Sequence, residues 1–484
     1  MTHFRPHYPP PAPRKPGPWQ LFFHKRRSWL DGLYERSYRM KMGEIHLPGV
    51  DLYMVNEPPL VRQVMVEQAA NFPKHEMLGD ALRPLLGDSI FTTNGAVWQR
   101  QRELMNPSFE AARVKRVFSR MRDAADAMVQ RLRAVPEGSE HDLEVEMTHV
   151  AADIILRTIL SQPLDGESAH RVFEAFERYQ ALAPRLMMPA FFGLRWLRPW
   201  WLRRQSQRAA AEIRSLLVGM IRPRYEDYQR ALRANDEAAA LPDDDILATL
   251  LRVRDAKTGE GFGFDQLVNQ VAMLFLAGHE TSASALSWSL HLLAHAPEVQ
   301  QRMHEEALAG LVGVEALDHN EVASRVKDMV LVRNVFRETL RLFPPVGFFA
   351  RQATVGCTMR DKQVKPGASV VISPWLIQRH RELWAAPDDF DPDRYEREAS
   401  DAEVAAGCPH ARESLRKAYL PFGMGPRVCI GTAFALQEAS LILAMLAREF
   451  RFEPVPGHVP QPVGRLTIRA DNGIRLKVHR WQAG

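Results

Sequence analysis

The residue best suited to chemistry is Cys429, in a segment from Pro421 to Gly431 that holds three glycines, two prolines and one arginine. Glycines allow tight turns and let a backbone approach a flat ligand closely. An apolar helical run begins near Ala433. The sulfur would therefore lie near backbone N–H groups and the positive end of a helix dipole, which favour the thiolate. The alternative is an ordinary buried cysteine, the usual fate of a lone one.

Several arginines, one of them beside this cysteine and others elsewhere in the chain, have the chemistry to bind a carboxylate. Arg427 adds a positive charge, and Phe422 can pack beside the ligand and keep water from the sulfur. Trp98 and Arg102 lie one helical turn apart, and Arg351 follows a pair of prolines. A guanidinium suits a carboxylate because it can donate two parallel hydrogen bonds. The alternative for each arginine is a solvated side chain.

A second candidate segment, Ala277-Gly278-His279-Glu280-Thr281, falls midway along a predicted long helix. Glycine inside a helix is less favourable than alanine by about 1 kcal/mol. The Thr281 hydroxyl can donate to the carbonyl of Ala277 and bend the helix. We expect a local opening that a ligand or water can fill. The alternative is a small residue that admits a neighbouring helix.

The elements that must position these segments are mostly helical. From about residue 59 a helical pattern runs for nearly 300 residues, and its longest helix covers 265–295, about 46 Å at 1.5 Å per residue, with Asp265 as its cap. Strand-like stretches occur at 45–47, 52–55, 349–373 and 465–479. Seven prolines in residues 1–18 predict an extended arm. The stretch 235–245 is typical of a loop.

Composition excludes several classes of protein. The chain has 484 residues, of which 46% are hydrophobic and 25% charged, and its 63 Lys and Arg exceed its 58 Asp and Glu only slightly. This mild excess is no nucleic-acid signature. Cys357, Cys408 and Cys429 are too few and too scattered for a disulfide framework, which favours a reducing compartment. No signal peptide and no uninterrupted apolar run of about 18 residues is apparent, so we expect a cytoplasmic protein without a spanning helix.

The cysteine segment resembles that of the cytochrome P-450 family, whose pattern is Phe-x-x-Gly-x-Arg-x-Cys-x-Gly. Every fixed position matches, at Phe422, Gly425, Arg427, Cys429 and Gly431. The resemblance covers roughly residues 40 to 480. It implies a mainly α fold with a small β-rich lobe, as one domain over 19–484 after the arm of residues 1–18. It also implies haem b (iron protoporphyrin IX) with a cysteine thiolate ligand, held between the long helix and the helix after the cysteine.

The resemblance also implies roles for the other segments. The long-helix segment resembles the family's oxygen-binding groove, in which Glu280 and Thr281 would deliver protons for splitting the O–O bond, a step that a carboxylate and a hydroxyl can relay from water. His279 would be a filler. The residues expected to contact the cofactor are Trp98, Arg102, Ala277, Gly278, Arg351, Phe422, Gly425, Arg427, Cys429 and Gly431.

A structural role is implied for Glu338, Arg341 and Arg394. By themselves, opposite charges three residues apart on a helix are common on surfaces and contribute about 0.2–0.5 kcal/mol. The resemblance makes them a buried charge network behind the haem, followed by Tyr395 where the family more often has Phe. The polar stretch 396–417 would lie near the face used by a partner.

An apolar substrate pocket is expected from Ala277, Val346, Phe348 and Phe349, which implies a lipophilic small molecule. The segment 187–201 is dense in aromatics and arginine and is expected either to touch a membrane surface or to pack as a helical corner. Electrons would come from a separate ferredoxin or flavodoxin with its reductase, docking near Lys417 and Arg427.

The function that follows is a monooxygenase that uses O2, two electrons and two protons to hydroxylate or epoxidise its substrate. One alternative is a peroxide-driven haem-thiolate enzyme or isomerase, although such enzymes often alter the pair that Glu280 and Thr281 form. Another is a haem sensor or carrier, which would need no proton relay.

Overall fold

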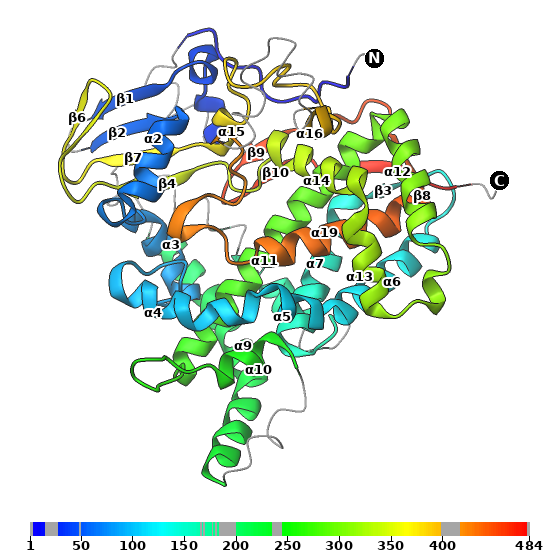
Figure 1. Ribbon diagram of the computed structural model, residues 1–484, viewed down its shortest axis with the longest axis horizontal. Coiled ribbons are helices and arrows are strands. Elements are labelled where there is room, and N and C mark those ends of the chain that lie inside the picture. Colours follow the sequence, from blue (N-terminus) through cyan, green and yellow to red (C-terminus); the bar gives the residue numbers. More distant parts are fainter. Residues whose placement is uncertain are drawn as a thin grey trace.

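The computed structural model describes residues 3–14, 28–47, 50–164, 200–234, 244–397 and 417–481, with residues 167, 170–176, 178, 179 and 182. Most of these residues are helical, and a smaller sheet-rich part lies to one side (Figure 1). The predicted mainly α fold with a small β-rich lobe is therefore confirmed. The helices are α2 (Pro58–Arg62), α3 (Glu76–Leu86), α4 (Gly95–Met105), α5 (Ala111–Arg116), α6 (Phe118–Arg133), α7 (Leu143–Leu160), α9 (Trp200–Arg233), α10 (Ile246–Arg252), α11 (Phe264–Ala294), α12 (Pro297–Gly310), α13 (His319–Asp328), α14 (Val330–Leu342), α15 (Pro374–Ile377), α16 (Arg394–Arg397) and α19 (Thr432–Glu449).

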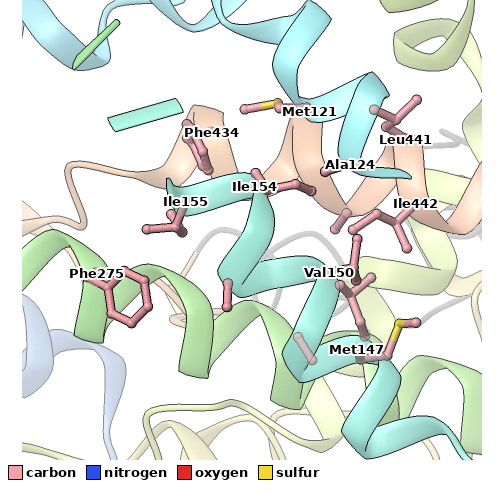
Figure 2. Packing of buried hydrophobic residues seen from close by; sticks show 14 of the residues in the cluster. Met121, Ala124, Met147, Val150, Ile154, Ile155, Phe275, Phe434, Leu441 and Ile442 are labelled. Carbon is pink, nitrogen blue, oxygen red and sulfur yellow. The ribbon is translucent and has the colours of Figure 1, made fainter. Parts of the chain in front are cut away.

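The core is built around α7, which is buried along almost its whole length. Its sequence supports a helix because Asp142 caps its N-terminus, accepting from the backbone N–H of Glu144 at 3.0 Å, and apolar residues then recur on every face. Side chains of α6, α11 and α19 pack around α7 (Figure 2). The helix that follows the cysteine and the long helix therefore share one core.

The sheet-rich part holds a mixed four-stranded sheet of order β1-β2-β7-β4. Its central pair is parallel, with Leu52 opposite Ser369, and the outer pairs are antiparallel. This sheet has its own apolar cluster, which includes Val55, Val370 and Ile372. The strands are β1 (Met42–Leu47), β2 (Val50–Val55), β3 (Ser139–Asp142), β4 (Phe349–Gln352), β5 (Cys357–Met359), β6 (Lys362–Val364), β7 (Ser369–Ile372), β8 (Phe450–Pro454), β9 (Pro462–Gly464), β10 (Ile468–Ala470) and β11 (Arg475–Arg480).

The long helix α11 begins one position earlier than expected and does not open. Gly263 is its N-cap, and Asp265 lies within the first turn, so the prediction that Asp265 caps the helix is wrong. The helix is continuous through Ala277–Thr281, so the local opening predicted there is not present. The carboxylate of Asp265 still suits its position, because a negative charge is favourable in the first turn of a helix.

The described part of the proline-rich arm, residues 3–14, runs extended across the molecule. Its side chains bind the loop before α16, where the Arg5 guanidinium contacts the Asp389 carboxylate at 2.9 Å. The Phe4 ring stacks on His295 at the end of α11, with 4.5 Å between ring centroids. Arg381 donates to the Tyr8 hydroxyl at 3.0 Å. The arm is thus fastened to three separate parts of the chain.

Some predictions fall on segments outside the described residues. Cys408, most of the stretch 396–417, most of 235–245 and residues 187–199 lie there. Trp200 and Trp201 are described, and both indoles are exposed at the start of α9. Within the described residues, no helix is long and apolar enough to cross a membrane.

Candidate active site at the cysteine loop

The cysteine loop is a tight turn that leads straight into α19. The Cys429 N–H donates to the Phe422 carbonyl at 2.9 Å and the Val428 N–H to the Gly425 carbonyl at 3.0 Å. The Thr432 hydroxyl, in the first turn of α19, donates to the Cys429 carbonyl at 2.9 Å. The loop therefore holds the sulfur at the N-terminus of a long buried helix, as the sequence predicts.

Gly425 is a position where no other residue fits. Its φ is +71°, a left-handed conformation that favours glycine. A Cβ atom there would lie 2.0 Å from the carbonyl oxygen of Met65. The required glycine thus lets the cysteine loop press against the chain segment that follows α2.

Cys429 keeps accessible surface although protein groups surround it closely. Burial is the strongest influence and raises the pKa of the thiol. The Gly431 N–H, Arg102, Thr432 and Lys74 act in the opposite direction without offsetting it. The loop alone therefore does not favour the thiolate as expected from the helix dipole, and a bound metal cation, which deprotonates a coordinating thiol outright, would have to do so.

Two predicted arginines meet beside this loop. Arg102 on α4 donates to the Val428 carbonyl and to the Asn106 side chain, each at 2.8 Å. Arg427 donates to the Asn94 side chain at 2.8 Å, and its guanidinium lies over the Trp98 ring at 4.1 Å from the centroid. The structure thus brings Trp98, Arg102 and Arg427 together, as the sequence predicts.

Two further cations complete the cluster. Arg351 on β4 is buried, and burial lowers its pKa to about 10. The backbone of Lys74 pairs with that of Arg351 in an isolated antiparallel β-bridge. The Lys74 ammonium donates to the Phe91 carbonyl at 2.9 Å. Burial, followed by the charges of Arg427, Arg351 and Arg102, lowers the pKa of Lys74 well below its usual value. Lys74 was not predicted, because it precedes α3 without any motif that would indicate this role.

No carboxylate of the described residues forms an ion pair with Lys74, Arg102, Arg351 or Arg427, although these four cations influence one another. Like charges held together in the protein interior are unfavourable unless a counter-charge joins them. The cluster therefore fits a ligand that carries carboxylates next to the cysteine.

The helix α11 has a short, partly exposed face. From residue 270 to 294, Ala277, Gly278 and Thr281 are partly exposed while the other residues are buried, and these three lie on one side of the helix. The Thr281 hydroxyl donates to the Ala277 carbonyl at 2.7 Å, as expected. A Cβ at Gly278 would lie 2.4 Å from the Ile155 side chain, so glycine is required by the packing of α7 against α11.

Glu280 points away from this face. Its Oε1 accepts from the Thr467 hydroxyl at 2.7 Å, while Oε2 is buried without a hydrogen-bond partner among the described residues. Burial raises the pKa of Glu280, and the nearby Arg469 acts against that rise. Glu280 and Thr281 are neighbours in sequence, but no hydrogen bond between their side chains is formed in the described structure.

The predicted pocket residues Val346, Phe348 and Phe349 are only half-buried, whereas Pro345 before them and Ala350 after them are buried. Phe349 lies against the cysteine loop, where a Cβ on Gly423 would be 3.5 Å from its ring. The segment 346–349 therefore borders the same region as the loop. Ala277, on α11, supplies the accessible apolar surface of that helix.

The predicted charge network is present and fully buried. Glu338 accepts from Arg341 at 2.8 and 2.9 Å and from Arg394 at 3.0 Å. Burial would raise the pKa of Glu338, but Arg341 and Arg394 outweigh it and hold the pKa at about 2. The Tyr395 hydroxyl also donates to Glu338, at 3.2 Å, so tyrosine gives this carboxylate a partner that Phe could not.

Gln378 links this network to the cysteine loop, and sequence analysis missed it. Its backbone carbonyl accepts from Arg341 at 2.9 Å, and its side-chain oxygen accepts from the Leu420 N–H at 2.7 Å. A lone glutamine carries no sequence signal for such a role. The network thus supports the start of the loop that presents Cys429.

A second buried carboxyl, Glu438 on α19, accepts from the Ser282 hydroxyl of α11 at 2.7 Å. Burial raises its pKa to about 8. Because the pKa of this carboxyl is higher in the folded than in the unfolded chain, the free energy of unfolding of the protein should fall as the pH rises from about 4.5 to about 8. Glu438→Gln is therefore expected to flatten the fall in denaturation midpoint between pH 5 and pH 8. Glu305→Gln on the exposed face of α12 is the control, and equal slopes for wild type and Glu438→Gln would refute the burial effect.

Comparison with known proteins identifies relatives along nearly the whole chain. The cytochrome P-450 family model matches residues 9–477. Cyclooctatin synthase of Streptomyces melanosporofaciens is 31% identical over 88% of this chain and 86% of its own. Pentalenene oxygenase of Streptomyces avermitilis is 29% identical over 95% of this chain and 94% of its own.

The fold has a counterpart among solved structures. The crystal structure of the cytochrome P-450DA heme domain superposes with a TM-score of 0.78, at 23% identity, over 99% of both chains. The family model covers far more than half of the chain, and the expected cysteine loop and buried charge network both occur in the structure. The chain belongs to the cytochrome P-450 family.

Proposed function

We propose that this chain is a haem-thiolate monooxygenase that oxidises a lipophilic small molecule. The observation that carries the proposal is the cluster of cations beside Cys429, which form no ion pair with any carboxylate among the described residues. The position of Cys429 before the N-terminus of α19 and the short, partly exposed face of α11 support it. Family membership supports haem as the cofactor and an oxygenase reaction. The cysteine ligand, the residue roles and the substrate class belong to the proposal.

The residues present fit haem b. Cys429 would ligate the iron, and Arg102, Arg351, Arg427 and Lys74 would neutralise the two propionates, which removes the unfavourable crowding of positive charge. Once bound, haem with a thiolate ligand supplies the redox chemistry by which one atom of O2 enters the substrate. Phe422 and the glycines of the loop would shield the sulfur from water. The remaining chemistry assigned to the chain is binding, orientation and proton supply.

Protons would reach the reacting oxygen from the α11 face. The Thr281 hydroxyl donates its own proton to the Ala277 carbonyl, which leaves its oxygen free to accept from a water molecule and fix that water's position. Glu280 holds its proton readily, because burial raises its pKa, and its Oε2 has no partner in the described structure. A carboxyl and a hydroxyl can pass protons through water. Because Glu280 points away from the α11 face and is bonded to Thr467, its proton would have to reach Thr281 through intervening groups or water.

Relatives support a hydrocarbon-like substrate. Pentalenene oxygenase is named for pentalenene, and cyclooctat-9-en-7-ol 5-monooxygenase of Streptomyces melanosporofaciens, 28% identical over 91% of this chain, is named for another lipophilic compound. The apolar side chains of Ala277, Val346, Phe348 and Phe349 suit such a molecule. Electrons would come from a separate ferredoxin or flavodoxin that docks on the side of Lys417 and Arg427. The cytoplasmic location stays a prediction from the cysteine content.

The proposed proton supply predicts uncoupling in Thr281→Ala. Without the hydroxyl, reducing equivalents and O2 should still be consumed, but product formed per O2 should fall by about tenfold or more, with hydrogen peroxide in its place. Thr158→Ala is a matched control, since Thr158 on α7 is buried and donates to the Ile154 carbonyl at 2.7 Å. For both variants, product, O2 consumption and hydrogen peroxide are measured during reductase-driven turnover of a panel of candidate substrates that includes pentalenene. Unchanged coupling in Thr281→Ala, or equal turnover with peroxide alone, would contradict the proposal.

A further inference from the structure

Trp29 fills a slot that two distant glycines leave open. Trp29 lies in the short 3₁₀ helix η1 (Trp29–Gly32), just after the arm. A Cβ on Gly347 would lie 2.2 Å from its indole Cζ2, and a Cβ on Gly464 would lie 2.3 Å from its Nε1. Both glycines are buried. The hydroxyl of Ser28, the residue before Trp29, accepts a hydrogen bond from the Gly464 N–H at 2.8 Å. No side chain larger than hydrogen can replace either glycine while the indole keeps its place.

The two segments that clasp Trp29 are anchored beside the α11 face. The hairpin of β9 and β10 contains Gly464, which is paired with Ile468 across the strands. The Ile468 carbonyl accepts from the Ser284 hydroxyl of α11 at 2.6 Å, and Thr467 donates to Glu280. The Ile468 N–H donates to the Pro345 carbonyl at 2.9 Å. The hairpin and the segment around Gly347 therefore form one unit attached to α11 near Thr281.

Trp29 also contacts Phe348, one of the residues proposed to line the substrate pocket. Its ring makes an edge-to-face contact with Phe348, with 5.4 Å between centroids. The next residue, Phe349, lies against the cysteine loop instead. The segment 346–349 thus has one aromatic directed at the loop and one directed at Trp29, and aromatic pairs of this geometry restrain each other's position.

We propose that Trp29 is a positioning residue for substrate size: it holds Phe348 and fixes the spacing between segment 346–349 and the β9–β10 hairpin. This inference rests on the proposed function, because it assigns a role at the pocket of that same site. Removing the indole should let Phe348 and the hairpin move apart and admit larger molecules. Adding a methyl group at Gly464 should displace the indole, weaken its hold on Phe348 and so act in the same direction.

The test uses the full-length holoprotein and two haem ligands of different size, imidazole and clotrimazole. Binding of each is followed by the shift of the Soret band on titration. For Trp29→Ala we expect the ratio of clotrimazole affinity to imidazole affinity to rise by about tenfold. A change of this size is within the range by which one methylene group alters discrimination in an apolar pocket. Trp29→Phe should lie between wild type and Trp29→Ala, and Gly464→Ala, which displaces the indole, should change the ratio in the same direction as Trp29→Ala.

Trp481→Ala controls for the loss of an indole elsewhere. Trp481 is also half-buried, and it stacks on His304 at 4.1 Å between centroids, against α12. A purely structural role for Trp29 would lower the melting temperature but leave the clotrimazole-to-imidazole ratio unchanged in Trp29→Ala and Trp29→Phe, and that result would overturn the inference. If instead the wild type shows no azole-induced shift at all, the haem proposal itself fails, which is a different outcome.

Discussion

Cys429→Ser is expected to abolish oxygenase turnover while leaving most of the fold in place. A serine hydroxyl is a poor iron ligand compared with a thiolate, and it cannot push electron density toward the metal to favour O–O cleavage. The loop should persist, because its geometry depends on backbone hydrogen bonds from Cys429 and Val428 and on the close approach of Gly425, none of which involves the sulfur. Product formation with a reductase system, together with the melting temperature, measures both effects.

Cys357→Ser is the matched control for this prediction. Cys357 is also a free cysteine, partly buried at the start of β5, and it lies outside the cluster around Cys429. Its replacement should leave turnover close to that of the wild type. Retained turnover in Cys429→Ser, or an equal loss in both variants, would show that Cys429 is not the ligand that activity requires.

The largest effect on stability is expected from Glu338→Ala. Removing the carboxylate leaves the buried guanidinium groups of Arg341 and Arg394 without their shared partner, and breaking a buried ion pair in this way typically costs about 3–5 kcal/mol. Loss of the network should also loosen Gln378 and the start of the cysteine loop, so haem content should fall with stability. Denaturant titration and the haem-to-protein ratio measure the two consequences.

The control here is Glu315→Ala, which removes an exposed carboxylate paired with Arg448 and should change stability by no more than about 1 kcal/mol. Because the pKa of Glu338 is held at about 2, its contribution should be present above pH 4.5 and lost only as the pH falls toward 2. A Glu338→Ala protein with wild-type stability and haem content would contradict the role of the network.

The sequence was most informative where chemistry is concentrated in a short segment. The cysteine loop could be predicted because five fixed positions within ten residues each have a local reason, such as the positive φ at Gly425. The spacing of Glu338 and Arg341 predicted only a helical charge pair, and the buried network that includes Arg394 could be predicted only through the family resemblance. The role of Tyr395 was not expected, and the structure gives its hydroxyl a partner in Glu338.

Residues that act through long-range contacts could not be predicted. Lys74, Gln378, Glu438 and Trp29 carry no motif, and each gains its role from partners that are distant in sequence. The expected opening of α11 was wrong because Gly278 is required by packing against Ile155, a contact with another helix that no local pattern reveals. Patterns local in the sequence therefore indicated the residues proposed to react, but not the residues that support them.

Thiolate ligation is tested most directly by one spectrum. The purified wild-type protein, expressed with adequate haem supply, is reduced with dithionite and exposed to carbon monoxide, and the difference spectrum is recorded. We expect a strongly red-shifted Soret band, because a thiolate ligand from Cys429 would donate electron density to the iron. A band at the position of histidine-ligated haem, or protein that contains no haem, would contradict the assignment of Cys429 as the iron ligand.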